Sequence, residues 1–152
     1  MAILSADSTL DLRTRGPIKT RRLTNGVASE TYYHGATVSY LAAGKITPVH
    51  ASGLSFAGIV SVASDGAIGT STKVEVIIAG EVHIPYTNFA LTDEGFGVYI
   101  DRSAASDNPA DLVPLAGTPE SAQDYLMGKV VEYTATGCWI ELATGHHPIL
   151  AA

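Results

Sequence analysis

The stretch that decides the fold is KVEVIIAGEVHIPY, which spans residues 73–86. Apolar and polar residues alternate at its start and β-branched residues are frequent, a pattern typical of a β-strand. Gly80 divides the stretch, and a glycine between two such runs indicates a bulge or a sharp bend, as at the corner of a barrel. We therefore expect strands over 73–78 and 81–86 with a break between them.

Further short strands are expected on both sides of this stretch. Residues 56–62 are almost continuously apolar, as in a strand that is buried on both faces. The other expected strands are 37–41, 46–49 after a turn at Gly44-Lys45, 97–101, and a hairpin of 127–133 with 138–142 around Thr136-Gly137. Short strands, glycine turns and the lack of a long helical pattern predict an all-β fold, a small β-barrel or sandwich.

Composition limits the class of protein. With 152 residues, 46% hydrophobic and 16% charged, the chain is one domain and too apolar to be disordered. No stretch reaches the roughly 20 apolar residues of a membrane span, and the N-terminus does not have the pattern of a secretory signal. The single cysteine, Cys138, cannot form an internal disulfide, which fits assembly in a reducing cytoplasm. We expect it to be a small buried hydrophobic residue.

Charge separates the N-terminus from the rest of the chain. The net charge is −6, yet residues 1–22 hold five basic residues against two acidic ones. We therefore divide the chain into an extended basic arm (1–25), a β-rich core domain (26–143) and a C-terminal tail (144–152), with a turn at Asn25-Gly26. A surface excursion over 103–124 contains three prolines, and Thr118-Pro119-Glu120 could start a short helix in it.

The arm is the candidate docking element. Leu10 and Leu12 alternate with polar residues, and Gly16-Pro17 interrupts any helical pattern. A basic arm on an acidic body could bind nucleic acid, bind an acidic protein surface or simply be solvated. The arm has no aromatic residue to stack on bases, which disfavours nucleic acid. We expect the arm to be ordered only where another surface holds it. The candidate docking residues are Leu10, Leu12, Arg13, Arg15, Lys19, Arg21 and Arg22.

Candidate chemistry is sparse. His146 and His147 are adjacent and lack the spacing of a metal site, and His83 is expected to point outward between Val82 and Ile84. The chain has no Walker loop, nucleophile elbow or dinucleotide-binding loop. Trp139 is expected to lie in the core or to anchor an interface. We therefore expect no catalytic residue, no metal and no cofactor.

The order of glycines and β-branched strands resembles that of the phage capsid cement (head decoration) proteins. The resemblance covers roughly residues 30–142 and rests on GATV (35–38), FAGIV (56–60), VEVIIAGEV (74–82), GVYI (97–100), MGKVV (127–131) and CWIEL (138–142). It implies a virion protein that binds the outside of an icosahedral shell, contacts the major capsid protein and forms oligomers, trimers more often than dimers. A fibre or tail protein and a small carbohydrate-binding β-barrel are the alternatives.

Overall fold

The structure is a computed structural model that describes residues 13–41, 44–48, 54–84, 91–100, 112–114 and 125–143. The described residues form β-strands and one 3₁₀ turn, η1 (Leu91–Asp93), without an α-helix, which confirms the all-β prediction. The strands are β1 (Arg13–Thr24), β2 (Thr37–Tyr40), β3 (Ile46–Thr47), β4 (Ser55–Val60), β5 (Lys73–Ile84), β6 (Gly97–Ile100), β7 (Leu112–Pro114), β8 (Tyr125–Thr134) and β9 (Gly137–Leu142).

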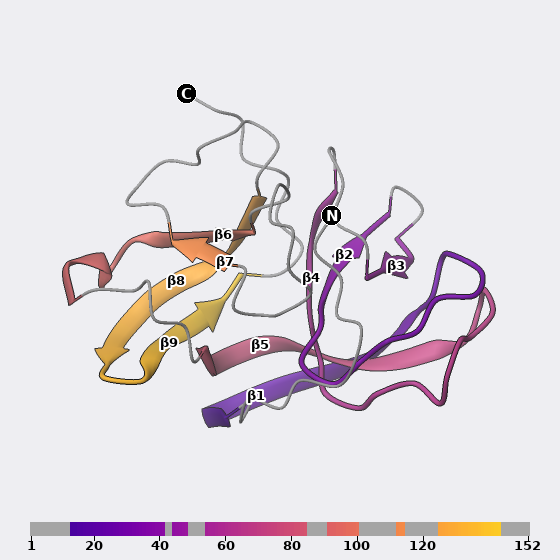
Figure 1. Cartoon of the computed structure of the whole chain (residues 1–152), viewed down its shortest axis with the longest axis horizontal. Coiled ribbons are helices and arrows are strands. Elements are labelled where there is room, and N and C mark those ends of the chain that lie inside the picture. The colour runs from indigo at the N-terminus through magenta and orange to yellow at the C-terminus, as the bar shows by residue number, and fades with distance from the viewer. Residues whose placement is uncertain are drawn as a thin grey trace.

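The strands form a curled antiparallel sheet in the order β3-β2-β4-β5-β9-β8-β6-β7. Strand β1 is not part of this order and pairs with β5. Figure 1 shows β2, β3 and β4 on one side and the β8–β9 hairpin with β6 and β7 on the other. Strand β5 runs below both groups, with β1 alongside it at the lower margin of the view (Figure 1). It pairs with β4 through Val76 and Ile77 and with β9 through residues 81–84, so it joins the two halves.

Gly80 makes the expected bend within β5, which continues through it as one strand. Its φ of 116° is a backbone conformation that side chains with a Cβ rarely adopt. Arg15 lies opposite Glu81 and Lys19 opposite Ala79, so three residues of β1, Gly16 to Ile18, stand opposite Gly80 alone. A Cβ at position 80 would lie 2.8 Å from Cγ2 of Ile18 and 2.9 Å from the Pro17 carbonyl oxygen. The bulge in β1 therefore requires glycine at this point of β5.

The bend also lets β5 contribute to two apolar cores. Val74, Val76 and Ile78 belong to one core cluster, whereas Ile77, Val82 and Ile84 belong to the other. Residues 77 and 82 are an odd number of positions apart and would face opposite sides of a regular strand. The irregular backbone at Gly80 reverses the alternation between them. Residues 74–78 and 82–84 are buried, apart from the partly exposed Glu75, and residues 79–81 at the bend are partly exposed. Strand β5 therefore lies at the centre of the fold.

A buried polar network fixes the end of β1. The Asn25 side chain is fully buried, and its Nδ2 donates to the carbonyls of Val27 (2.6 Å) and Gly69 (3.0 Å). Its Oδ1 accepts from the Val27 N–H (3.2 Å) and from the hydroxyl of Tyr32 (2.6 Å), which also lies 3.0 Å from the Ile46 carbonyl oxygen. Neither Asn25 nor Gly26 has a positive φ. The expected Asn-Gly turn is therefore wrong, because the amide is used inside the core.

The remaining strand predictions agree with the structure. Strands β2, β3, β4 and β6 occupy the expected positions, and β8 and β9 form the predicted hairpin with Gly137 at a φ of 150°. Of the excursion over 103–124 only β7 is described, paired with β6, and the expected helix start at Thr118 lies outside the described residues. The tail over 144–152 also lies outside them.

Candidate functional site

The described part of the basic arm is a strand of the sheet. Residues 13–24 form β1 and pair antiparallel with β5 from Arg13 opposite His83 to Thr24 opposite Lys73. The expectation that the arm lacks partners within its own chain is therefore wrong for these residues, because β5 supplies a complete backbone edge. Nine of the twelve residues of β1 are nevertheless exposed, so the strand is held by backbone pairing rather than by apolar burial.

One face of the sheet carries charged side chains across four strands. Cross-strand pairing aligns Arg13, His83, Trp139 and Glu132 in one row, and Arg15, Glu81, Glu141 and Lys129 in the next. Directly paired residues project to the same side of a sheet, so these eight side chains share a face, which we call the charged face. The opposite side of the same strands carries the core residues Val82, Val130 and Ile140.

Arg15 is the centre of the charged face. Its guanidinium group binds Oε1 of Glu81 through Nε (3.1 Å) and Nη2 (2.9 Å), and Oε2 of Glu132 through Nη1 (2.6 Å). These hydrogen bonds, first to Glu132 and then to Glu81, raise the pKa of Arg15 above its ordinary value. The same guanidinium lies 4.4 Å from the ring centroid of Trp139, within the range of a cation–π contact. Arg15 thus ties β1 to β5, β8 and β9 at once.

Trp139 and two arm residues therefore meet, although they are far apart in the sequence. The guanidinium of Arg13 lies 5.8 Å from the Trp139 ring centroid, and the ring of His83 packs edge-on at 5.2 Å. Trp139 is half-buried, with its ring beneath the two arginines of β1. Its role within the described residues is to hold the arm.

His83 does not point into solvent. It projects away from Val82 and Ile84, as its place in the strand requires, but it is only 1% exposed. Trp139 packs against its ring, and Nε2 lies 3.1 Å from the Thr134 hydroxyl. The expectation of an outward histidine is wrong because the charged face is itself covered at this point by neighbouring side chains.

The basic residues after the bulge are placed differently from Arg15. Among the described residues, no carboxylate oxygen lies within 4.0 Å of Lys19, Arg21 or Arg22. The ion pairs of β1 are those of Arg15. All three residues are exposed. Arg21 and Arg22 are adjacent in the regular part of the strand, so they project from opposite faces. We call these three residues the basic run.

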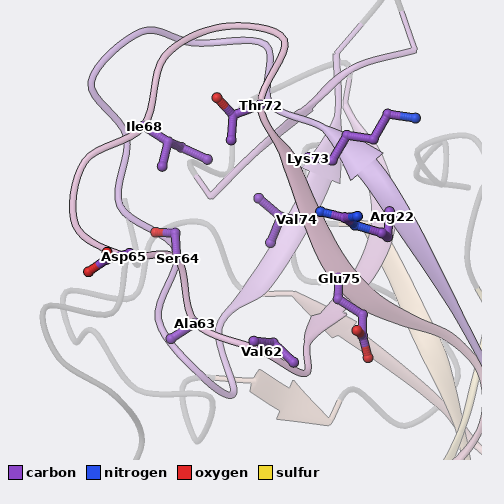
Figure 2. A pocket seen from close by; sticks show the side chains of 10 residues that line it. All are labelled: Arg22, Val62, Ala63, Ser64, Asp65, Ile68, Thr72, Lys73, Val74 and Glu75. Carbon is purple, nitrogen blue, oxygen red and sulfur yellow. The ribbon is translucent and has the colours of Figure 1, made fainter.

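Arg22 borders a pocket of about 420 Å³ at the start of β5. Figure 2 shows the Arg22 guanidinium beside Val74, with Ile68 across the hollow and Lys73 and Glu75 at its border. The charges at this border are mixed, because Asp65 also lines the pocket. The Glu75 carboxylate accepts a hydrogen bond from the Ser61 hydroxyl at 3.0 Å. The pocket therefore gives Arg22 an environment distinct from that of Lys19 and Arg21.

A second exposed surface is apolar. Leu91, Phe96 and Tyr133 are 66%, 41% and 36% exposed. The segment 91–96 runs along β8, because the Phe96 carbonyl accepts from the Val130 N–H (3.0 Å) and the Glu94 carboxylate accepts from the Tyr133 N–H (2.9 Å). We call these three residues the apolar patch. Large exposed apolar side chains that gather in one place are typical of contact surfaces.

The other candidates from the sequence add no chemistry. Cys138 is fully buried in a core cluster, as expected, and forms no disulfide. Within the described ranges, no group of three or more histidine, cysteine or acidic residues could hold a metal ion. Leu10, Leu12, His146 and His147 lie outside the described residues. Of the elements described, none is a helix of the length and apolarity that a membrane crossing requires.

Comparison with known proteins finds no matching family model and no significant match among curated proteins. The site must therefore be interpreted from its own residues.

The acidic partners of Arg15 could not be identified from the sequence. Glu81 and Glu132 are ordinary exposed-face residues of two strands, and only the register of β1 on β5 brings them to one guanidinium. Glutamates of β5, β8 and β9 (Glu81, Glu132 and Glu141) form an acidic sheet face only once the strands are paired. An acidic face is a natural support for a basic strand.

Proposed function

We propose that this chain is a structural protein of a phage virion. It binds the outer surface of the icosahedral capsid and bridges neighbouring copies of the major capsid protein. The proposal rests on the sequence resemblance to cement proteins and on one structural observation. That observation is the basic run, which an otherwise acidic chain presents on an exposed strand.

The basic run supports docking to protein better than a structural role within the domain. A cation that served only the fold would be expected to have an acidic partner nearby, as Arg15 does in Glu81 and Glu132. Lys19 and Arg21 have no such partner among the described residues, whereas Arg22 stands opposite Glu75 without an ion pair between them. Opposite charges across an interface accelerate encounter and select the partner. The outer surface of a shell subunit with clustered carboxylates is the partner that this arrangement favours.

The proposal includes self-association of the chain, as a trimer in the favoured form and as a dimer in the alternative. The apolar patch supports it, because Leu91, Phe96 and Tyr133 offer exposed apolar surface for a contact. Contact between copies would remove these side chains from water. An oligomer also binds a symmetric shell through several sites, which raises the effective concentration of each site for the lattice.

The proposed mechanism is mechanical and requires no catalytic residue, cofactor, nucleic acid or membrane. A pressurised capsid opens where neighbouring subunits separate, and a clamp across that joint raises the free-energy barrier to opening. Binding only to the assembled state stabilises it by about 2.7 kcal/mol per site when the free concentration is about a hundredfold above Kd. Many equivalent sites multiply this effect over the particle.

The test compares shells with and without the chain for genome release on heating. Decorated particles are expected to release their genome at a higher temperature than undecorated ones. Replacing Lys19 and Arg21 of the basic run with glutamine (K19Q/R21Q) is expected to reduce binding, while K45Q/K129Q removes the same charge elsewhere as a matched control. Equal heat resistance of decorated and undecorated particles, or a location inside the shell, would contradict the proposal.

A further inference from the structure

The outer edge of β1 offers backbone groups for pairing. Among the described residues β1 pairs with β5 alone, on one of its two edges. An edge strand of this kind presents unpaired N–H and C=O groups, which serve as a template for a further strand. With twelve residues, β1 is as long as β5 and is exposed over most of its length.

The second half of this edge, from Lys19 to Thr24, is the part in which every residue of β1 is matched to a residue of β5. In the first half, Arg15 is engaged with Glu81, Glu132 and Trp139, and the bulge from Gly16 to Ile18 interrupts the pleat. Pro17 has no N–H to offer. From Lys19 to Thr24 each residue of β1 is matched to a residue of β5; the register shifts once, between Lys19 and Thr20, and is regular from Thr20 to Thr24. Six residues of antiparallel strand extend over about 20 Å, enough for a partner strand of ordinary length.

The charges of this half select the partner. Arg21 and Arg22 are neighbours in the regular part of the strand and project on opposite sides, so a strand added here meets cations on both of its faces. Opposite charges directly across two strands are favourable and like charges are destabilising. A second copy of β1 would set basic residues against basic residues. The same cations that prevent copies from pairing therefore favour an acidic strand.

We infer that the edge of β1 from Lys19 to Thr24 accepts an extended acidic segment of the shell subunit as an added β-strand. The identity of the partner rests on the proposed function, whereas the mode of binding rests on β1 itself. In this mode the backbone hydrogen bonds supply affinity and the cations supply selectivity. The cations of the basic run then contact a partner strand that the backbone of β1 holds in place.

The experiment uses the full chain and synthetic peptides. The probe is an acetylated eight-residue peptide that alternates valine and glutamate, labelled for fluorescence polarisation. Its matched control has the same sequence with N-methyl groups on the four central residues, which keeps the charge and removes the hydrogen-bond donors on both edges. A third peptide replaces glutamate with lysine.

The unmodified acidic peptide is expected to bind, and N-methylation to weaken binding about tenfold or more, because loss of one to two hydrogen bonds of about 1 kcal/mol suffices for that change. The lysine peptide is expected not to bind. The double variant K19Q/R21Q should weaken binding of the acidic peptide, whereas K45Q/K129Q, with the same loss of charge elsewhere, should not.

Equal binding of the methylated and unmethylated peptides would overturn the inference, because it would show attraction by charge alone. No binding of either acidic peptide would overturn it as well. None of these results would contradict the proposed function. That proposal fails only if the intact chain does not bind or stabilise shells.

Discussion

Replacement of Asn25 with alanine is expected to destabilise the protein far more than removal of the Tyr32 hydroxyl, although the two groups share a hydrogen bond. Asn25→Ala removes five side-chain hydrogen bonds, one of them long at 3.5 Å, in a fully buried place. The Val27 N–H and carbonyl lose these partners, and the Gly69 carbonyl keeps only a long 3.4 Å bond from the Thr72 N–H. A buried polar group without a partner costs about 1–3 kcal/mol, so we expect a loss of about 3–5 kcal/mol.

Tyr32→Phe leaves the neighbouring groups satisfied. Oδ1 of Asn25 still accepts from the Val27 N–H, and the Ile46 carbonyl still accepts from the Gly26 N–H at 2.8 Å. The expected loss is therefore about 1 kcal/mol, the net value of one ordinary hydrogen bond. The double variant should lose about 1 kcal/mol less free energy of unfolding than the sum of the two single variants, because each single variant already removes the shared hydrogen bond.

The assay is urea unfolding of the three variants, followed by the fluorescence of Trp139, the single tryptophan. The free energy of unfolding and the slope m are compared, since a changed slope would indicate a change other than stability. A Tyr32→Phe loss equal to or larger than that of Asn25→Ala would refute the reasoning. Additive losses would refute the shared bond.

The same tyrosine gives a pH dependence with a defined sign. Burial raises the pKa of Tyr32 above its ordinary value, and the negative charge of Glu30 raises it further by a smaller amount. The folded state therefore retains the phenolic proton at pH values where the unfolded chain begins to lose it, above about 10. Stability from this group is complete below that pH and is lost as pH rises. Tyr32→Phe should flatten the alkaline limb of the stability curve.

Three other predictions follow from single features of the chain. Gly80→Ala should lower the free energy of unfolding by about 2–4 kcal/mol, from overpacking and the positive φ, whereas Gly69→Ala, which meets no atom within 4 Å, should not; equal urea midpoints would contradict the role of the bend. The double variant L91S/F96S should shift the chain toward monomer in sedimentation, with Val62→Ser (56% exposed) as the control, and an unchanged mass would exclude the apolar patch from the contact between copies. Replacing His146 and His147 with alanine should leave the melting temperature and metal content unchanged, and stoichiometric metal lost in the variant would disprove this.

The strands were predictable because burial leaves a local pattern. In β4 and β5, continuous or alternating apolar residues follow directly from contact with the two cores, and the glycine at position 80 marks the bend between them. The β8–β9 hairpin is also local, since its turn joins strands that are neighbours in the sequence. Each of these features depends on residues within a few positions of one another.

The features that the sequence did not predict depend on distant contacts. Strand β1 has almost no apolar burial, and its partner β5 follows some sixty positions later in the chain. His83 alternates away from the core as expected, yet the ring of Trp139 packs against it and it is only 1% exposed. Asn25 has the residue type of a turn, but its amide meets carbonyls of the 68–69 segment. Residue type alone does not distinguish these outcomes.

The two ends of β1 are held by interactions of different physical kinds. The basic run lies between them and is the part of the strand on which the proposed binding depends. At the C-terminal end, Asn25 and Tyr32 form hydrogen bonds out of contact with water, which salt does not screen. At the N-terminal end, Arg15 forms ion pairs that are partly exposed and therefore screened by salt. Between them, Lys19 and Arg21 lie on a strand whose inner edge is paired and whose cations lack acidic partners among the described residues. A strand fixed at both ends loses little conformational entropy when a partner binds along it. Docking through a strand that is already ordered is thus better suited to tight binding than docking through a free arm would be.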